Sequence, residues 1–457
     1  MTCDRRRFLK VGGAALASAG LGVRASEIVA EDAATLAPEE AVESGHWGGV
    51  RSKSFSLSPK YVYANNSTLG ATLKPVKKRM EAVQKLFSDG CNLDLFVADI
   101  IMSIRPMREA LARVVNAPAA GKYLGNVDSV TEGMSLVANG LTFERGDVIL
   151  ITDHEHTGGR TMWELQRDRY GARVVTVPLL GPDDTEATWR ENLLGRFAEA
   201  LAPGDVKVMS FPWITTSTGH VLPAKELCAL AKSSGALSVV DAAQAFAVLP
   251  VDVADLDCDF LVANGHKYLC GPVGSGFVCV HPRRVTELAS FWPTVVDEQY
   301  YNPADLTKHY PYRKSGVAAY TNLLPLQDAL EFYESLGAAA VHARLSLVGN
   351  WLRTGLAAFP DRFSLITPRG EGLSCVMTCF RMAPGGPSSE EVTTRLKDEF
   401  AVHGKWSTEG GADAVRLSPH YYTKVSEFDA IARALCKIAG VNHRDWFAAA
   451  PLDWLKG

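Results

Sequence analysis

Two ionisable side chains follow apolar runs that predict buried strands. Asp241 directly follows the run Ala236–Val240, and Lys267 comes shortly after the run Phe260–Ala263. If these strands are parallel, both side chains lie at the carboxyl edge of one sheet, where ligands bind in such folds. A lysine amine can bond covalently to an aldehyde, and a carboxylate can keep a pyridine nitrogen protonated. The pair therefore indicates a pyridoxal phosphate site, with an ordinary ion pair as the alternative.

A third segment carries groups that suit a phosphate. Ser129, Val130 and Thr131 precede the helical stretch Met134–Leu141, so hydroxyl groups and backbone N–H groups gather at a helix start. Helix N-caps use the same residue types, and this is their more common role. The segment thus predicts either a phosphate cradle or a cap.

Imidazole side chains follow the predicted strand Asp147–Thr152. The next residues are Asp153-His154-Glu155-His156, which places aromatic rings at the same sheet edge, where one can stack on a flat cofactor. A metal site formed by His154, Glu155 and His156 is the alternative, although no further ligand motif accompanies them.

The elements that position these residues alternate between strands and helices. This alternation predicts βαβ units, an α/β fold and a mostly parallel sheet. After about Leu330 the pattern changes to a smaller α+β unit. The predicted strands are Asp147–Thr152, Arg173–Pro178, Val206–Phe211, Ala236–Val240, Phe260–Ala263 and Gly276–Val280, with later ones at Phe363–Thr367 and Gly372–Arg381. The predicted helices include Glu186–Leu201, Pro223–Ser233, Val341–Phe359, Ser389–His403 and Val425–Ala439.

Composition limits the class of protein. The 457 residues are 47% hydrophobic and 21% charged, with a net charge of -4, which suits a large globular protein and argues against nucleic acid as a partner. Nine cysteines include no CxxC pair, so we expect neither a disulfide framework nor a zinc cluster.

The amino terminus resembles a twin-arginine export signal. Arg5-Arg6-Arg7-Phe8-Leu9-Lys10 precedes a short, Gly-rich apolar run that ends near a small-x-small site before Ser26. We therefore expect a periplasmic or secreted protein without a stable membrane anchor. The expected organisation is a signal peptide over 1–25, a tether and N-terminal arm over 26–60, a large domain over 61–335 and a small domain over 336–457.

Four motifs together resemble the class V aminotransferase (cysteine desulfurase-like) family of fold-type I pyridoxal phosphate enzymes. They are Asp241-Ala-Ala-Gln244, Gly265-His-Lys-Tyr-Leu-Cys-Gly-Pro272, Ser129-Val-Thr-Glu-Gly133 and Glu155-His156. The resemblance covers roughly residues 61–440. It implies a large domain with a mostly parallel seven-stranded sheet, a smaller C-terminal domain, a homodimer and a small amino acid or peptide substrate.

The resemblance also implies a role for each matching residue. Lys267 would be the cofactor-binding lysine and Asp241 the partner of the ring nitrogen. Arg416, in Val415-Arg-Leu-Ser-Pro-His420, would bind the substrate carboxylate, with a surface ion pair as the alternative. The remaining implied contacts are Gln244 to the ring hydroxyl, His156 stacked on the ring, and Thr131, the Val130 backbone and His266 to the phosphate.

Departures from the desulfurase pattern narrow the expected activity. Residues 406–413 hold no cysteine, Thr216 stands where desulfurases carry Asn, and Val317 replaces a threonine that binds phosphate across the dimer, for which Ser315 could substitute. The sequence is therefore more similar to the isopenicillin N epimerase-like branch. That branch includes epimerases, C–S lyases and exported tailoring enzymes, among them a periplasmic enzyme of pyoverdine siderophore maturation with the same type of signal.

The resemblance leaves the reaction open between transamination, epimerisation and β-elimination. Each begins when the freed Lys267 removes a Cα proton. Epimerisation needs a second base, for which His154 or a tyrosine is a candidate. The stretch Phe291–Tyr312 is either an active-site loop or dimer packing, and a non-catalytic exported binding protein is the alternative of another class. The candidate tyrosines are Tyr300, Tyr301, Tyr310 and Tyr312.

Overall fold

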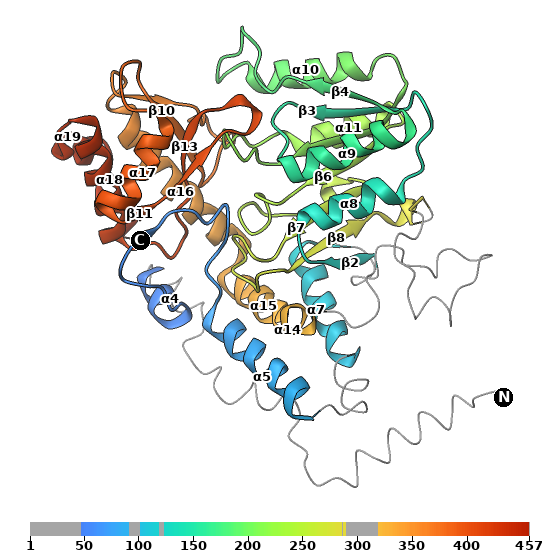
Figure 1. Ribbon diagram of the computed structural model, residues 1–457, viewed down its shortest axis with the longest axis horizontal. Coiled ribbons are helices and arrows are strands. Elements are labelled where there is room, and N and C mark those ends of the chain that lie inside the picture. The colour runs from blue at the N-terminus through green and yellow to red at the C-terminus, as the bar shows by residue number, and fades with distance from the viewer. Residues whose placement is uncertain (1–46, 91–100, 118–122, 286, 289–318, 457) are drawn as a thin grey trace.

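The computed structural model describes residues 47–90, 101–117, 123–285, 287–288 and 319–456 (Figure 1). Four predicted features lie outside these residues: the signal over 1–25, most of the tether, the stretch Phe291–Tyr312, and the position of Ser315 and Val317. Within the described residues, no helix combines the length and apolarity that crossing a membrane requires.

A seven-stranded sheet forms the centre of the large unit. Its strand order is β2-β8-β7-β6-β5-β3-β4, and all neighbours are parallel except β8, which runs antiparallel to β2 and β7. The prediction of a mostly parallel seven-stranded sheet is confirmed. The strands are β2 (Leu124–Val127), β3 (Val148–Thr152), β4 (Arg173–Val177), β5 (Val206–Pro212), β6 (Leu237–Asp241), β7 (Phe260–Asn264) and β8 (Gly276–Val280).

Helices cover both faces of this sheet. On one face, α8 (Val130–Gly140) and α9 (Thr157–Tyr170) pack on side chains such as Ile149. On the other, α10 (Trp189–Leu201) and α11 (Ala224–Ser233) pack on side chains such as Leu150. Neighbouring residues of a strand point to opposite faces of the sheet, and helices cover both faces. Successive residues are therefore all buried, which explains the uninterrupted apolar runs in the sequence.

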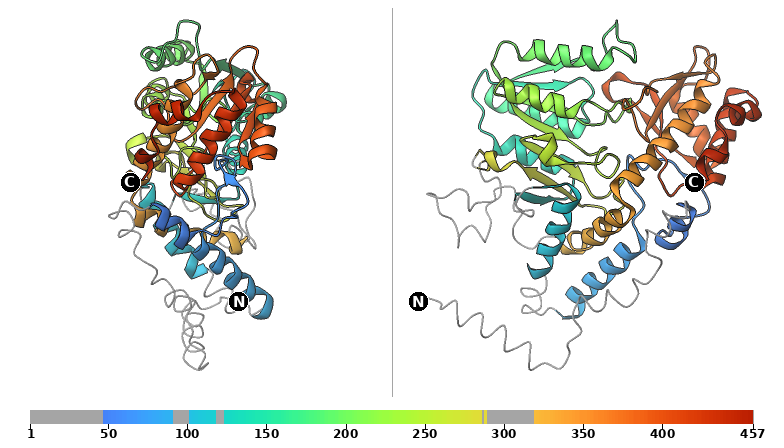
Figure 2. Two further views of the ribbon diagram at one scale, coloured as in Figure 1. Left: turned by 90° about the vertical axis from the view of Figure 1, so that its left-hand side faces the viewer. Right: turned by 180° about the vertical axis from the view of Figure 1, so that it is seen from behind.

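The C-terminal unit contains a four-stranded antiparallel sheet in the order β12-β13-β10-β9. It lies beside the large unit, and the long helix α16 (Ala338–Ala357) leads into it (Figures 1 and 2). The other elements are β9 (Phe363–Leu365), β10 (Thr378–Met382), α17 (Ser389–Phe400), β11 (Val402–His403), β12 (Lys405–Ser407), β13 (Ala414–Leu417), α18 (Val425–Ala439) and α19 (His443–Ala449).

The described N-terminal residues join the two units. After α4 (Trp47–Ser54), strand β1 (Val62–Tyr63) pairs in parallel with β11 of the C-terminal unit. Residues 64–73, here called the crossing segment, then run to the large unit. There α5 (Lys74–Gly90) packs with α14 (Tyr320–Leu323) and α15 (Leu326–Leu336), and α7 (Ile101–Val114) also packs on α15.

The crossing segment is bonded to both units. Ser67 Oγ lies 2.7 Å from Ser418 Oγ in the C-terminal unit. Gly70 N donates to His266 O at 2.8 Å in the large unit. The segment therefore connects the neighbourhood of Arg416 directly to that of Lys267.

Candidate active site

Lys267 lies in a tight loop after β7. Gly271 N donates to Gly265 O at 2.9 Å, and a Cβ on Gly265 would lie 2.5 Å from Ser275 Oγ, so a larger residue there would displace the Ser275 side chain. The loop also packs against Gly70, where an added Cβ would lie 1.8 Å from the Lys267 carbonyl oxygen. Backbone contacts on both sides thus fix where the lysine side chain starts.

The Lys267 amine lies in a desolvated site. Burial lowers its pKa to about 8, Asp241 offsets part of this effect, and the nearby Arg416 guanidinium adds to it. A larger fraction of this amine is therefore neutral near pH 7 than for an ordinary lysine, as a nucleophile or a base requires.

Asp241 is the last residue of β6 and is 3% exposed. Its Oδ1 accepts a hydrogen bond from Ala243 N at 2.8 Å. Burial raises the pKa of the carboxyl, while Lys267 and His156 act in the opposite direction. A buried carboxyl of this kind favours a cationic partner in the cavity, and the protonated pyridine nitrogen of pyridoxal phosphate would be one.

His156 caps the amino end of α9. Its Nδ1 accepts from Gly158 N at 3.0 Å, and its Nε2 lies 3.5 Å from Glu409 Oε1. A Cβ on Gly158 would lie 2.4 Å from Thr131 Oγ1, so the starts of α8 and α9 meet here. The structure therefore brings His156 and Thr131 to the same cavity wall.

The cap prediction for Ser129 is confirmed, because Ser129 Oγ accepts from Glu132 N at 3.2 Å. The Val130 N–H donates to Asn264 Oδ1 at 2.8 Å, so it is not the free phosphate donor that the resemblance implied. Thr131 remains a hydroxyl donor in the first turn of α8, and helix starts favour anions.

His266 and Gln244, for which cofactor contacts were predicted, line the same cavity. His266 Nδ1 lies 3.1 Å from Ser275 O, which makes Nδ1 the protonated nitrogen, and burial and Lys267 lower the pKa of the ring. Gln244 Nε2 donates to Ser67 O at 3.0 Å. Its buried Oε1 has no partner among the described residues. An unpaired buried polar atom fits a cavity that receives a polar ligand.

Arg416 projects from the middle of β13 and is 1% exposed. Its terminal nitrogens donate to Thr216 O at 3.1 Å and Thr68 Oγ1 at 2.7 Å, with Asn65 Oδ1 at 3.3 Å. None of the carboxylates that the structure describes forms an ion pair with it. The charge is thus held by neutral groups and is available to an anionic ligand, so a surface ion pair is excluded.

These residues enclose one cavity of about 220 Å³. The amine, the buried carboxyl, the imidazole and the hydroxyl groups fit pyridoxal phosphate, and Arg416 fits a carboxylate beside it. The sequence did not point to Ser67 and Thr68 of the crossing segment, to Lys405 of β12 or to the nearby Glu409. The lining includes Ser67, Thr68, Ser129, Val130, Thr131, His156, Thr216, Asp241, Gln244, Asn264, His266, Lys267, Lys405 and Arg416.

The metal-site alternative does not form. His154 Nδ1 lies 2.7 Å from Asp153 Oδ1, whereas Glu155 Oε1 accepts from Thr152 Oγ1 at 2.9 Å. In the part of the chain that the structure describes, no three potential ligands gather around a common point. His154, the candidate second base, also does not line the cavity around Lys267.

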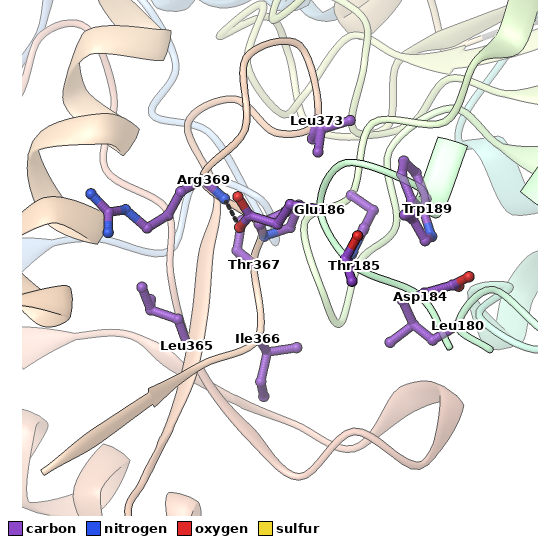
Figure 3. A pocket seen from close by; sticks show the side chains of 12 residues that line it. Leu180, Asp184, Thr185, Glu186, Trp189, Leu365, Ile366, Thr367, Arg369 and Leu373 are labelled. Atoms are coloured by element: carbon purple, nitrogen blue, oxygen red, sulfur yellow. Dashed lines mark hydrogen bonds between the residues drawn. The ribbon is translucent and has the colours of Figure 1, made fainter. Parts of the chain in front are cut away.

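A second cavity of about 240 Å³ lies where the loop before α10 meets the segment after β9 (Figure 3). Glu186 Oε1 accepts from Arg369 N at 2.6 Å across this contact. The described residues that line it include no lysine, so it lacks the amine that the cofactor needs. The chemistry therefore belongs to the cavity around Lys267.

The fold and this cavity define a pyridoxal phosphate-dependent enzyme. The chain belongs to the class V aminotransferase family (Aminotransferase class-V), which matches residues 74–403. The resemblance stated from the sequence motifs is thereby confirmed.

Curated relatives include epimerases and desulfurases. The isopenicillin N epimerase of Streptomyces clavuligerus is 30% identical over 362 residues, or 76% of this chain and 87% of the relative. The isopenicillin N epimerase of Amycolatopsis lactamdurans is 26% identical, covering 86% of this chain and 98% of the relative. A probable cysteine desulfurase of Vibrio cholerae is 26% identical, covering 72% of this chain and 81% of the relative.

Solved structures share the fold. A cystine C–S lyase in complex with its product cysteine persulfide gives a TM-score of 0.72 at 21% identity, covering 84% of this chain and 98% of that one. The Escherichia coli cysteine desulfurase CsdA gives a TM-score of 0.71 at 18% identity, covering 86% of this chain and 98% of that one. The fold-type I prediction is thus confirmed.

Proposed function

We propose that this enzyme acts at Cα of an amino acid, or of an amino acid within a larger metabolite, and carries out epimerisation or transamination. The observation that carries the proposal is that Lys267, Asp241 and Arg416 face one cavity. Two isopenicillin N epimerases cover most of the chain. The absence of cysteine from residues 406–413 argues against persulfide chemistry.

Each side chain has a defined task in this proposal. When bound, pyridoxal phosphate supplies an electrophilic carbon and an electron sink for negative charge at Cα. Arg416 binds the α-carboxylate and fixes the orientation of Cα. Lys267 Nζ takes the Cα proton, for which a pKa of about 8 suits it. Asp241 would keep a positive charge at the ring nitrogen, His156 would lie against the ring, and Thr131 and His266 would hold the phosphate.

Two tests address this function. Borohydride reduction followed by peptide mass analysis should find the cofactor on Lys267, and Lys267→Ala should lose both this adduct and activity. The enzyme should then be incubated with amino acids and amino acid-containing peptides, with separate assays for inversion, keto acid and ammonia. Ammonia with a β-elimination product would favour the second candidate, a C–S lyase, which the shared fold of the cystine lyase brings into consideration. A Lys267→Ala variant with unchanged function would instead favour a non-catalytic binding protein.

We further propose export through the twin-arginine pathway and a homodimer, with siderophore tailoring as one setting for such an enzyme. The arginine cluster at Arg5-Arg6-Arg7 supports export. Replacing Arg5, Arg6 and Arg7 by lysine should retain the protein in the cytoplasmic fraction. Sedimentation of the purified enzyme tests the dimer.

A further inference from the structure

The cavity holds a second cation beside Arg416. Lys405 on β12 stands directly opposite Arg416 on β13 in the antiparallel register. Side chains of directly opposite residues lie on the same face of a sheet, with Cβ atoms about 5 Å apart. Both residues line the cavity that contains Lys267.

Lys405 has no ion-pair partner among the described side chains. It forms no hydrogen bond and no ion pair with any of them, and it is partly buried. Burial and the adjacent Arg416 lower the pKa of Lys405, and Glu409 acts in the opposite direction. Glu409 makes its close contact elsewhere, with Oε1 3.5 Å from His156 Nε2.

Glu409 is the nearby carboxylate and forms no ion pair with either Lys405 or Arg416. Two adjacent cations of this kind favour the binding of anions, because each buried or partly buried charge gains from a close counter-charge. In the proposed function, on which this inference rests, Arg416 binds the α-carboxylate. We propose that Lys405 binds a second carboxylate, on the side chain of the substrate, so that the site selects amino acids that carry two carboxylates.

The test compares matched amino acids on the holoenzyme. L-Glutamate and L-2-aminoadipate are titrated against L-glutamine, and the change in cofactor absorbance gives each Kd. The variants are Lys405→Met, which removes the charge, and Lys405→Arg, which keeps it. Lys437→Met, on the exposed surface of α18, is the matched control. The Kd of pyridoxal phosphate is measured for each variant.

The wild type should bind the two dicarboxylic amino acids about ten- to one-hundredfold more tightly than L-glutamine, as a charge-assisted hydrogen bond provides. Lys405→Met should abolish this preference without changing the Kd of L-glutamine or of the cofactor, and Lys405→Arg and Lys437→Met should retain it. Three results would overturn the inference. The wild type could bind L-glutamine as tightly as the two dicarboxylic amino acids, or none of the three amino acids could change the cofactor absorbance. Lys405→Met could also weaken the binding of all three amino acids by the same factor. A weaker cofactor Kd would instead assign Lys405 to the phosphate. Loss of the Lys267 adduct tests the proposed function separately.

Discussion

Gly70 in the crossing segment provides a sharp test of how the lysine is positioned. In Gly70→Ala the new Cβ would lie 1.8 Å from Lys267 O and 2.8 Å from Lys267 C. Cβ contacts below 3.0 Å essentially do not occur, so the two backbones must separate by at least 1.2 Å. The Lys267 carbonyl is backbone, so no side-chain rotation can relieve the clash.

A misplacement of about 1 Å can reduce catalysis about 10²-fold. We therefore expect Gly70→Ala to lower kcat/KM by about two orders of magnitude and to slow covalent attachment of pyridoxal phosphate. Attachment is followed by visible absorbance after the cofactor is added to apoenzyme. Steady-state kinetics use the substrate that the inversion, keto acid and ammonia assays identify.

Gly195→Ala in α10 is the matched control, because no atom beyond its chain neighbours and the backbone of its own helix lies within 4 Å of a Cβ there. It should retain full activity and gain about 0.5–1 kcal/mol in the free energy of unfolding, since alanine is the better helix former. If Gly70→Ala attaches the cofactor and turns over substrate at wild-type rates, the contact between the crossing segment and Lys267 does not position the amine.

Three further predictions follow from charged groups. Burial lowers the pKa of Lys267 to about 8, so the rate of cofactor attachment to apoenzyme should rise with pH and level off above this value. Stopped-flow absorbance measures this rate. A midpoint above about pH 10, the ordinary lysine pKa, would contradict the desolvated site. Arg416→Lys should raise KM for carboxylate substrates about ten- to one-hundredfold, because the bidentate guanidinium donor is lost. An unchanged KM would exclude Arg416 from substrate binding. Asp259→Ala removes the 1% exposed carboxylate that pairs with Arg283 and Arg284. The free energy of unfolding, measured by urea denaturation, should fall by about 3 kcal/mol, while the cofactor absorbance is retained. An unchanged free energy of unfolding would show that these pairs contribute little.

The sheet could be predicted because its strands are buried on both faces. Val148–Thr152 and Phe260–Asn264 are apolar runs followed by polar residues, so both the strands and the side chains at their ends were evident. β2 was missed, since Leu124-Gly-Asn-Val127 contains two poor strand formers. The predicted strand Gly372–Arg381 is shorter, Thr378–Met382, because Gly372 has a positive φ and Leu373 O accepts instead from Val221 N.

The substrate end of the cavity depends on long-range pairing that a sequence does not display. Arg416 could be named from its motif, but its neighbour Lys405 follows from the register between β12 and β13. Ser67 and Thr68 lie in a polar stretch without periodicity, and they reach the cavity because β1 pairs with β11. Such contacts are fixed by tertiary packing, not by local preference.

The hydrogen bond from Asn66 Nδ2 to Ser418 O joins residues 352 positions apart. A nascent chain therefore lacks the wall that carries Arg416 until nearly all of it has left the ribosome. Contacts of such separation form late, since closing the intervening chain is costly in entropy. The substrate end of the catalytic chamber is consequently among the last parts of this polypeptide to form, and a truncation that removes β13 removes Arg416 from it.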